Sequence, residues 1–509
     1  MTRMLTFICV FWLTSLHMYA QTRRSPAGEE VPERKTIKLP GGKAKDIPEG
    51  PYKPTWESVK ENYQVPEWWK DGKFGIFIHW GLYAVPAYQS EWYSKHMYGN
   101  EGIQKRHVEK YGPVDKFGYK DFIPMFTADK FKPKAWAELF RKAGARYIVP
   151  TAEHHDGFAM YESDLTKWDA KDMGPHRDLI GELAKAVRNE GLKFGVSNHR
   201  MENWNFMYPA LATKSDLFDP AYADFYGPPQ PTRKREPAAG IAAGDEVMNG
   251  LDAPQSQAFL EEWLRRCQEL VDKYQPDMFW FDNGVNGRAF DPIKLRFAAY
   301  YYNSASKWKK QVSISTKSDA YLYGSIKDFE RQGRAPKELT DYGWQVDDPV
   351  LSRFGYTENS LIVDVNTVVT RLIENVSRNG ALLLNISPKA DGTIPDDQQK
   401  LLLQIGGWLD VNGEAIYATR AWKKFGEGNF RFTTKGNILY AISLKSPEET
   451  AILESLPASF GKVSRVSLLG QKENLTFVQN EKGLKIDLSA VNSGSIAWAF
   501  KIEGLDLKQ

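Results

Sequence analysis

The chain has 509 residues with a formal net charge of +3, which is close to balance for this length. This charge argues against nucleic acid or an anionic membrane as the main partner. Aromatic residues are abundant, with 16 Trp, 24 Tyr and 27 Phe. Such side chains stack on sugar rings, but they also fill large cores, and composition alone favours the core.

Residues 1–20 carry an early Arg3, a short apolar run and a small residue, Ala20, at the end. This is the pattern of a secretory signal peptide. The run is shorter than the roughly 20 residues that span a bilayer, so we expect an exported protein, periplasmic or extracellular, without a membrane anchor. Cys9 leaves with the signal, and because only Cys267 then remains, no intramolecular disulfide is predicted.

Residues 21–55 are rich in Pro, Gly, Lys and Arg, which indicates an extended lead-in. Over residues 56–412, short apolar runs alternate with amphipathic helical patterns. The runs cover 74–80, 147–155, 193–199, 278–283, 311–316 and 381–386, and the helical patterns include 134–144, 177–191 and 259–274. This alternation predicts parallel β/α units, and its length favours a (β/α)8 barrel over an open sheet. No Gly-rich phosphate loop follows the first run, which weakens a dinucleotide-binding interpretation.

Polar residues stand at the ends of several predicted strands. They are His79, Trp80, His154, His155, His199 and Asp282. In a barrel, the carboxyl ends of the strands carry the active site, so these residues are expected to meet at one mouth. Polar residues also end strands elsewhere, and the argument therefore depends on the whole set.

Two further regions differ from this pattern. Residues 205–257 form a long insertion after the third run, which would overhang the barrel mouth as an entrance or a mobile loop. From residue 413 to residue 509, short alternating segments separated by turn residues predict an antiparallel β-sandwich. We expect this second domain to be structural.

Asp282 directly follows an apolar strand with aromatic neighbours. It is either a nucleophile held by a rigid strand or a capping Asp at a turn. A glycosidase that retains configuration needs a second carboxyl group roughly 5 to 5.5 Å away as acid and base. The candidates in the following loops are Asp328, Glu330, Asp347 and Asp348.

The His residues have a competing interpretation as a metal site. Adjacent residues on a strand point to opposite faces, so His154 and His155 are poor joint ligands. We therefore predict no metal and no other cofactor. Neutral imidazoles are also suited to sugar hydroxyls, because each ring offers one donor and one acceptor.

Several motifs together resemble the α-L-fucosidases of glycoside hydrolase family 29. The matches run in order over about residues 56–420, as KFGIFIHWGLYAVPA, SEWY, EHHDGF, RDLIGEL, FWFDNG, NGALLLNISPKADGTIP and WLDVNGEAIY. The resemblance implies a (β/α)8-like barrel followed by a β-sandwich, and hydrolysis with retention and without a metal. It also implies that Asp282 is the nucleophile. The residues that it places in the sugar pocket are His79, Glu91, Trp92, His154, His155 and Trp280.

Alternatives remain for some of these residues, since Trp92 and Trp280 could pack in the core and Glu91 could form an ion pair. The sequence also departs from the family. Lys317 stands where an Arg is expected, and SNHR replaces a Tyr-containing strand end and offers His199. We include His199, Lys317 and Trp344 among the predicted substrate-binding residues.

The acid/base is assigned by resemblance and elimination. Many family members have a Trp-Glu pair after the nucleophile, but this chain reads Trp344-Gln345, and Gln has no titratable proton. The resemblance implies that other members supply the acid from an earlier loop, which corresponds to KDFERQGR in this chain, and Glu330 is therefore the predicted acid/base. A surface charge is the alternative for Glu330. If the assignment is correct, we expect burial or the Asp282 charge to raise the pKa of Glu330.

The predicted function is a retaining exo-α-L-fucosidase that acts on a terminal fucose of a glycan. An α-L-galactosidase is the nearest rival, because an apolar pocket wall rejects one added hydroxyl only about a hundredfold. A non-catalytic sugar-binding protein is the alternative from a different class. The sequence contains no indication of the oligomeric state.

Overall fold

The computed structural model describes residues 41–227, 255–317, 319–446, 449–489, 491 and 496–507. The predicted signal peptide lies outside these residues, as do residues 228–254 of the insertion. In the part of the chain that is described, no helix is both long enough and apolar enough to cross a membrane.

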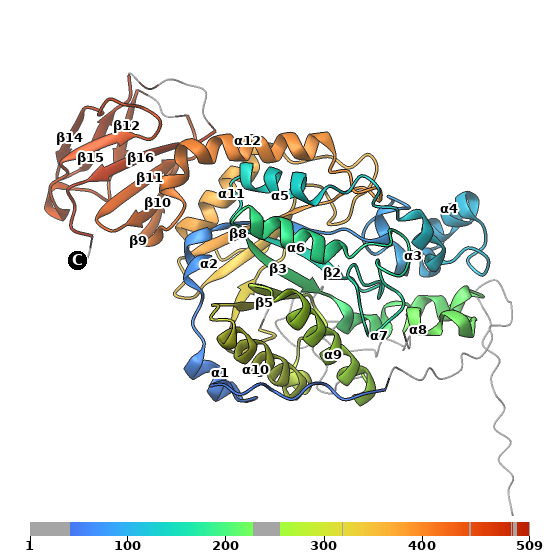
Figure 1. The fold of residues 1–509 in the computed structure, drawn as a ribbon. Helices are drawn as coiled ribbons and strands as arrows, with labels where there is room; N and C mark the ends of the chain where they lie inside the picture. The colour runs from blue at the N-terminus through green and yellow to red at the C-terminus, as the bar shows by residue number, and fades with distance from the viewer. Residues whose placement is uncertain are drawn as a thin grey trace, which may run out of the picture.

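Eight parallel strands close into a barrel in chain order, which confirms the predicted (β/α)8-like fold (Figure 1). The strands are β1 (Phe74–Ile78), β2 (Tyr147–Glu153), β3 (Lys193–Asn198), β4 (Met278–Phe281), β5 (Ser313–Lys317), β6 (Ser325–Asp328), β7 (Trp344–Pro349) and β8 (Gly380–Ile386). The last strand pairs with the first, so no edge is left open.

Strands β6 and β7 were not predicted from the sequence. Strand β6 has only four residues, and the interior face of β7 carries Gln345 and Asp347 instead of apolar side chains. Gln345 Nε2 donates to Asp328 Oδ2 on the neighbouring strand at 2.7 Å. Because these polar groups bond to one another inside the barrel, the strands lack the apolar run by which a buried strand is recognised.

Helices pack outside the barrel. They are α1 (Trp56–Asn62), α2 (Glu67–Gly72), α5 (Pro133–Lys142), α6 (Leu179–Asn189), α9 (Gln257–Tyr274), α10 (Asp291–Lys307), α11 (Val365–Ser377) and α12 (Asp396–Asn412). Helix α9 shows why they form: the Ser256 side chain caps Phe259 N at 3.3 Å, and Gln275 ends the helix in the left-handed conformation. The apolar face of this helix buries Trp263 against Phe281 of β4.

Alternation along β4 divides the core into two layers. Phe279 and Phe281 face outward and pack on Phe297 of α10, whereas Met278 and Trp280 face the barrel interior. The interior layer also contains Phe77, whose ring centroid lies 4.8 Å from that of Trp280. The barrel is therefore a packed core below its mouth.

Antiparallel sheets follow the barrel, which confirms the predicted C-terminal fold. Helix α12 ends at Asn412 and the first strand of this region begins at Arg420. One sheet has the order β13-β16-β11-β10-β9 and the other has the order β12-β15-β14. The strands are β9 (Arg420–Glu427), β10 (Phe430–Lys435), β11 (Ile438–Ser443), β12 (Thr450–Leu453), β13 (Arg465–Leu468), β14 (Phe477–Asn480), β15 (Gly483–Asp487) and β16 (Trp498–Glu503).

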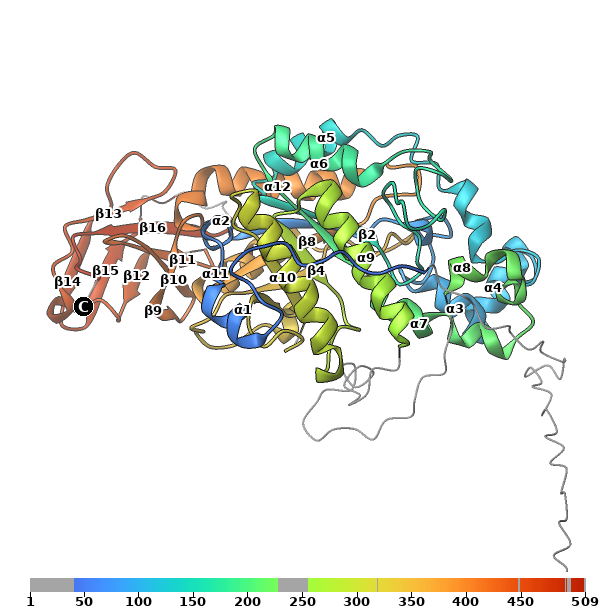
Figure 2. The ribbon, with the colours of Figure 1, turned by 60° about the horizontal axis from the view of Figure 1, so that its bottom comes forward.

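These sheets lie at one end of the molecule in both views (Figures 1 and 2). At the other end, segments that follow β1 and β3 build up the surroundings of the barrel mouth. Their helices are α3 (Tyr93–Gly99), α4 (Glu101–Tyr111), α7 (Asn203–Phe206) and α8 (Ala223–Tyr226). The second domain therefore lies away from the mouth.

Candidate active site

Asp282 lies at the end of β4 and makes four polar contacts. One carboxylate oxygen, Oδ1, is 2.6 Å from Lys317 Nζ and accepts a hydrogen bond from Asn283 N at 2.8 Å. The other, Oδ2, is 2.9 Å from His199 Nδ1 and 3.3 Å from His155 Nε2. Burial by itself raises the pKa of Asp282, but the Lys317 ammonium and the two imidazoles hold it well below its ordinary value. The carboxylate is therefore ionised, as a nucleophile must be.

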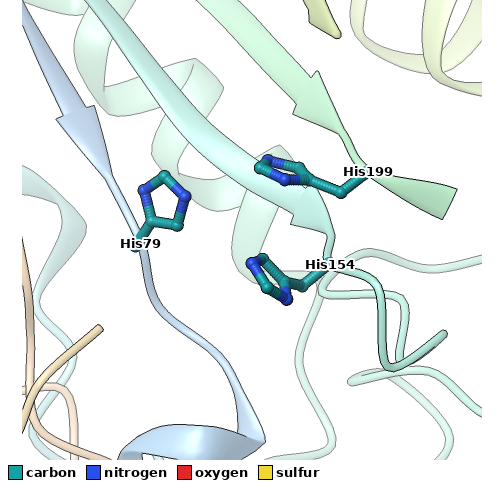
Figure 3. Close-up of side chains that lie close together, drawn as sticks. All are labelled: His79, His154 and His199. Carbon is teal, nitrogen blue, oxygen red and sulfur yellow. The ribbon is translucent and has the colours of Figure 1, made fainter. Parts of the chain in front are cut away.

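Three imidazoles from the ends of β1, β2 and β3 converge on one point: His79, His154 and His199 (Figure 3). Burial lowers the pKa of His199 to about 4 and lowers the pKa values of His79 and His154 well below 6.5. All three rings are therefore neutral at neutral pH. His79 Nδ1 is fixed by Asn385 Oδ1 at 2.7 Å, while His154 Nδ1 is buried without a partner among the described residues.

His155 has a different environment from the other three. Its Nδ1 atom lies 3.0 Å from the His199 carbonyl and 3.2 Å from Glu202 Oε2. Burial opposes its protonation, but the carboxylates of Glu202 and Asp282 outweigh burial and raise the pKa of His155. His155 is therefore the imidazole of this group that most readily carries a positive charge.

The ring nitrogens of His79, His154 and His199 lie within 4.8 Å of one another, as a group that could hold a transition metal. Both nitrogens of His199 are already engaged, Nδ1 by Asp282 and Nε2 by Ser197 Oγ at 3.1 Å. A metal would have to displace one of these partners. The free positions on His79 and His154 are suited to hydroxyl groups, which favours sugar binding over metal coordination.

Lys317 connects Asp282 to Glu330. Its Nζ atom lies 2.6 Å from Asp282 Oδ1 and 2.7 Å from Glu330 Oε2, so these two oxygens are at most about 5.3 Å apart. A separation of roughly 5 to 5.5 Å is typical of glycosidases that retain configuration, and inverting enzymes need a wider gap for a water molecule. The structure thus brings Glu330 and Asp282 together.

The expected ionisation of Glu330 is wrong. The Lys317 ammonium lowers the pKa of Glu330, against the opposing effects of partial burial and of the Asp282 charge. Sequence reasoning considered burial and Asp282, but it did not place the Lys317 ammonium between the two carboxylates. Glu330 is consequently ionised in this arrangement, and an acid role requires a source for its proton.

Trp280 and Trp344 occupy different surroundings from those predicted. Trp280 is fully buried beneath His199 and Lys317, and its Nε1 donates to Asp328 Oδ2 at 2.8 Å, which favours the core-packing alternative. Trp344 is also fully buried, packs on Phe329 outside the barrel wall and donates to the Arg378 carbonyl. This placement contradicts the prediction that Trp344 binds the sugar.

Glu91 and Trp92 lie in the segment after β1, beside the His cluster. The Trp92 ring is half-buried, with its centroid 5.8 Å from that of His155 and 5.4 Å from that of Phe206. Glu91 Oε2 accepts a hydrogen bond from Gly355 N at 2.9 Å. Trp92 thus lies beside His155 of the site, whereas Glu91 holds the loop after β7 in place.

Sequence reasoning missed several residues that surround the His cluster. Glu202 contacts His155, the Tyr83 ring lies 5.1 Å from His154, and the Phe354 ring lies 5.0 Å from His79. The Tyr83 hydroxyl is buried without a partner in the described part of the chain. The sequence could have pointed to two of them as site residues, because Tyr83 is within the GLYAVPA motif and Glu202 follows His199 by three residues.

A buried ring of four charges supports the His residues from behind. Arg200 contacts Glu153 at 2.7 Å and Glu262 at 2.8 Å, and Arg266 contacts the same two carboxylates at 3.5 and 2.6 Å. Glu153 directly precedes His154 in the sequence, and Arg200 directly follows His199. The ring therefore connects the carboxyl ends of β2 and β3 to α9.

This ring predicts a loss of stability in acid. Burial alone raises the pKa of Glu262, but the Arg200 and Arg266 guanidinium groups outweigh it and lower the pKa to about 2. A lowered folded-state pKa contributes stability that is present above the unfolded value of about 4.3 and is lost as the pH falls toward 2. We expect the urea midpoint to fall between about pH 5 and about pH 2.5, and to fall less in Glu262→Gln. Equal falls in the two proteins would contradict this assignment.

A parallel eight-stranded barrel with paired carboxylates and imidazoles at its mouth defines the class of protein, a glycoside hydrolase. The family model for α-L-fucosidase matches residues 42–414, and that for the α-L-fucosidase C-terminal domain matches residues 425–503. The chain belongs to the α-L-fucosidase family.

Relatives and solved structures agree with this assignment. The chain is 32% identical over 468 residues to tissue α-L-fucosidase of Rattus norvegicus, covering 89% of this chain and 92% of the relative. It is 31% identical to plasma α-L-fucosidase of Homo sapiens, covering 86% and 88%. A crystal structure of Thermotoga maritima α-fucosidase in complex with a mechanism-based inhibitor has a TM-score of 0.71 and 31% identity, over 89% of this chain and 99% of that one.

Proposed function

We propose that this protein is a retaining exo-α-L-fucosidase that hydrolyses terminal α-L-fucosyl residues of glycans. The observation that carries the proposal is the bridge from Asp282 through Lys317 to Glu330, which brings an oxygen of each carboxylate to within at most about 5.3 Å of the other, close enough for a double-displacement mechanism. The family and its solved members support L-fucose as the sugar that is removed. Thermotoga maritima α-fucosidase has been solved in complex with fucose, and this chain is 31% identical to it with a TM-score of 0.70.

In the first step, Asp282 attacks the anomeric carbon, and the bond to the leaving oxygen breaks as Glu330 delivers a proton to that oxygen. A covalent fucosyl-enzyme results. In the second step, Glu330 removes a proton from water, whose oxygen attacks the same carbon and releases Asp282. Two displacements at one carbon retain its configuration.

The imidazoles would orient the sugar. Because His79 is neutral and its Nδ1 donates to Asn385, its Nε2 can accept from a sugar hydroxyl, whereas the neutral His154 ring can donate to one hydroxyl and accept from another. His199 and His155 both contact Asp282 and fix the position of its carboxylate. Lys317 adds a positive charge beside the nucleophile. An Arg at this position would instead offer a planar guanidinium that can bind a carboxylate in a bidentate way.

The decisive test is release of nitrophenol from an aryl α-L-fucoside by the mature protein, with the configuration of the first-formed sugar followed by NMR. Formation of α-L-fucose first would support the proposal. Formation of the β-anomer would exclude a retaining mechanism. Turnover of the α-L-galactoside in preference to the fucoside would identify the rival substrate, and sugar binding without turnover would identify a non-catalytic protein.

Glu330→Gln tests the acid/base assignment. We expect kcat/KM for a poor leaving group to fall by about 10² to 10⁴-fold, because Gln cannot deliver a proton. A dinitrophenyl fucoside needs little acid help, so its kcat/KM should change much less. Steady-state kinetics on the two substrates measure the difference.

Glu338→Gln is the matched control, since this exposed Glu lies in the same connection between β6 and β7. It should leave both substrates unaffected. Equal losses on both substrates in Glu330→Gln would point to a disturbed pocket and would count against an acid/base role.

The protein is also proposed to be exported, and the support is the signal pattern of residues 1–20. Amino-terminal sequencing of the secreted protein would test this. A mature chain that begins soon after Ala20 is expected, and an intact Met1 would contradict export by this signal.

A further inference from the structure

Glu330 has a neighbour on the adjacent strand, Asp347. Strands β6 and β7 pair Lys327 with Trp344 and Asp328 with Gln345. The ladder continues past the end of β6, because Phe329 N donates to the Gln345 carbonyl and Arg331 N donates to the Asp347 carbonyl, both at 2.9 Å. This register sets Glu330 opposite Asp347.

Both side chains belong to the interior face. Asp328 and Gln345 bond to each other inside the barrel, whereas Phe329 packs on Trp344 outside it. Since side chains alternate along a strand, the residues two positions after Asp328 and Gln345 also face inward. These are Glu330 and Asp347, on strands roughly 4.8 Å apart.

The hydrogen bonds distinguish the charge states of Asp328 and Asp347. Asp328 accepts from Trp280 Nε1 at 2.8 Å, from Gln345 Nε2 at 2.7 Å and from Asp347 N at 3.2 Å. These donors lower the pKa of Asp328, although burial raises it more and leaves it above its ordinary value. Asp347 is 1% exposed, and neither of its oxygens has a hydrogen-bond partner in the described part of the chain. A buried carboxyl group without donors is stable only in its neutral form.

The charged groups around Asp347 agree with this difference. Burial and the Asp328 carboxylate raise the pKa of Asp347 well above its ordinary value, and Glu330 adds to the effect. Lys317 of β5 opposes it, and Lys317 is already shared by Asp282 and Glu330. On the outer face of β7, Arg371 of α11 contacts Asp348 at 2.6 Å. The mouth thus holds an ionised Glu330 beside a protonated Asp347.

We propose that Asp347 is a positioning residue of the acid/base, a neutral acid whose proton passes to Glu330 for delivery to the leaving oxygen. In this step the Asp347 O–H bond breaks and a Glu330 O–H bond forms, so Asp347 becomes a carboxylate near Lys317. When Glu330 later takes a proton from water, that proton returns to Asp347. The inference rests on the proposed function, and it provides the proton that the ionised Glu330 lacks.

The test is Asp347→Asn, which keeps the size and neutral charge of the protonated acid but carries no titratable proton. We expect kcat/KM for a poor leaving group to fall by about 10²-fold or more, with kcat/KM for a dinitrophenyl fucoside nearly unchanged. The basic limb of the pH profile should move to lower pH, because Glu330 then keeps only its own lowered pKa. A residue with only a structural role would not produce this leaving-group dependence.

Asp348→Asn is the matched control on the same strand, because its side chain faces outward to Arg371. It should preserve the leaving-group dependence and the pH profile of the wild type. If Asp347→Asn does not fold, Asp347→Ser replaces it, since Ser is smaller, is uncharged and carries no acidic proton.

Two results would overturn the inference. They are an unchanged pH profile with wild-type leaving-group dependence, and an equal loss on all substrates. If the wild type hydrolyses fucosides, either result would refute the role of Asp347 and leave the proposed function intact. A wild type that hydrolyses no fucoside removes the proposed function, and this inference with it.

Discussion

Asp282→Asn is expected to lower kcat for an aryl α-L-fucoside by on the order of 10⁴-fold. The amide cannot form the covalent fucosyl bond, and an activated leaving group does not relieve this defect. Asn has nearly the size and shape of Asp and keeps one oxygen for Lys317 and the imidazoles, so sugar affinity should change much less than turnover. Single-turnover kinetics together with fucose titration would measure the two effects separately.

Asp277→Asn is the control for this variant, because Asp277 lies just before the same strand, at its other end. Its Oδ2 accepts from Phe194 N at 3.1 Å, so its loss should affect stability without affecting chemistry. Asp282→Asn with more than about a tenth of wild-type kcat would contradict the assignment of the nucleophile.

Arg200→Met is expected to lower the free energy of unfolding by about 3 to 5 kcal/mol. Arg200 contacts Glu153 and Glu262 in a region that solvent hardly reaches, and its removal leaves Arg266 as the one guanidinium of the ring for two buried carboxylates. Urea denaturation followed by tryptophan fluorescence provides the measurement. Activity should fall as well, because Arg200 adjoins His199 in the chain.

The matched control is Arg465→Met in the C-terminal sheets. Arg465 pairs with Glu503 at 2.5 Å, but its side chain is 50% exposed, so the expected loss is about 1 kcal/mol or less. A similar small loss in Arg200→Met would show that the buried ring contributes little, and would refute the argument from burial.

The strands with strong apolar runs were predictable from the sequence. The runs at β1 to β5 and at β8 mark their strands because burial on both faces requires apolar residues. Strands β6 and β7 escaped prediction, since Asp328 and Gln345 satisfy each other inside the barrel. Local sequence does not reveal a polar residue whose partner is on another strand.

The candidate site was predictable in part for the same reason. Asp282 and the His residues follow apolar strands, and parallel strands deliver their ends to one mouth. Trp280 and Trp344 were assigned to the sugar pocket from motifs. Both are buried instead, because burial depends on which face of the barrel wall each side chain occupies. The pKa of Glu330 was predicted in the wrong direction because the Lys317 contact joins two strands.

By itself, the sequence determined the barrel, the antiparallel C-terminal domain, the family and the meeting of Asp282 with the His residues. These follow from hydrophobic periodicity and from motifs, which are local properties of the chain. Only the tertiary structure decided the charge states of Glu330 and Asp347, because a pKa depends on burial and on charges that neighbouring strands bring within a few ångströms.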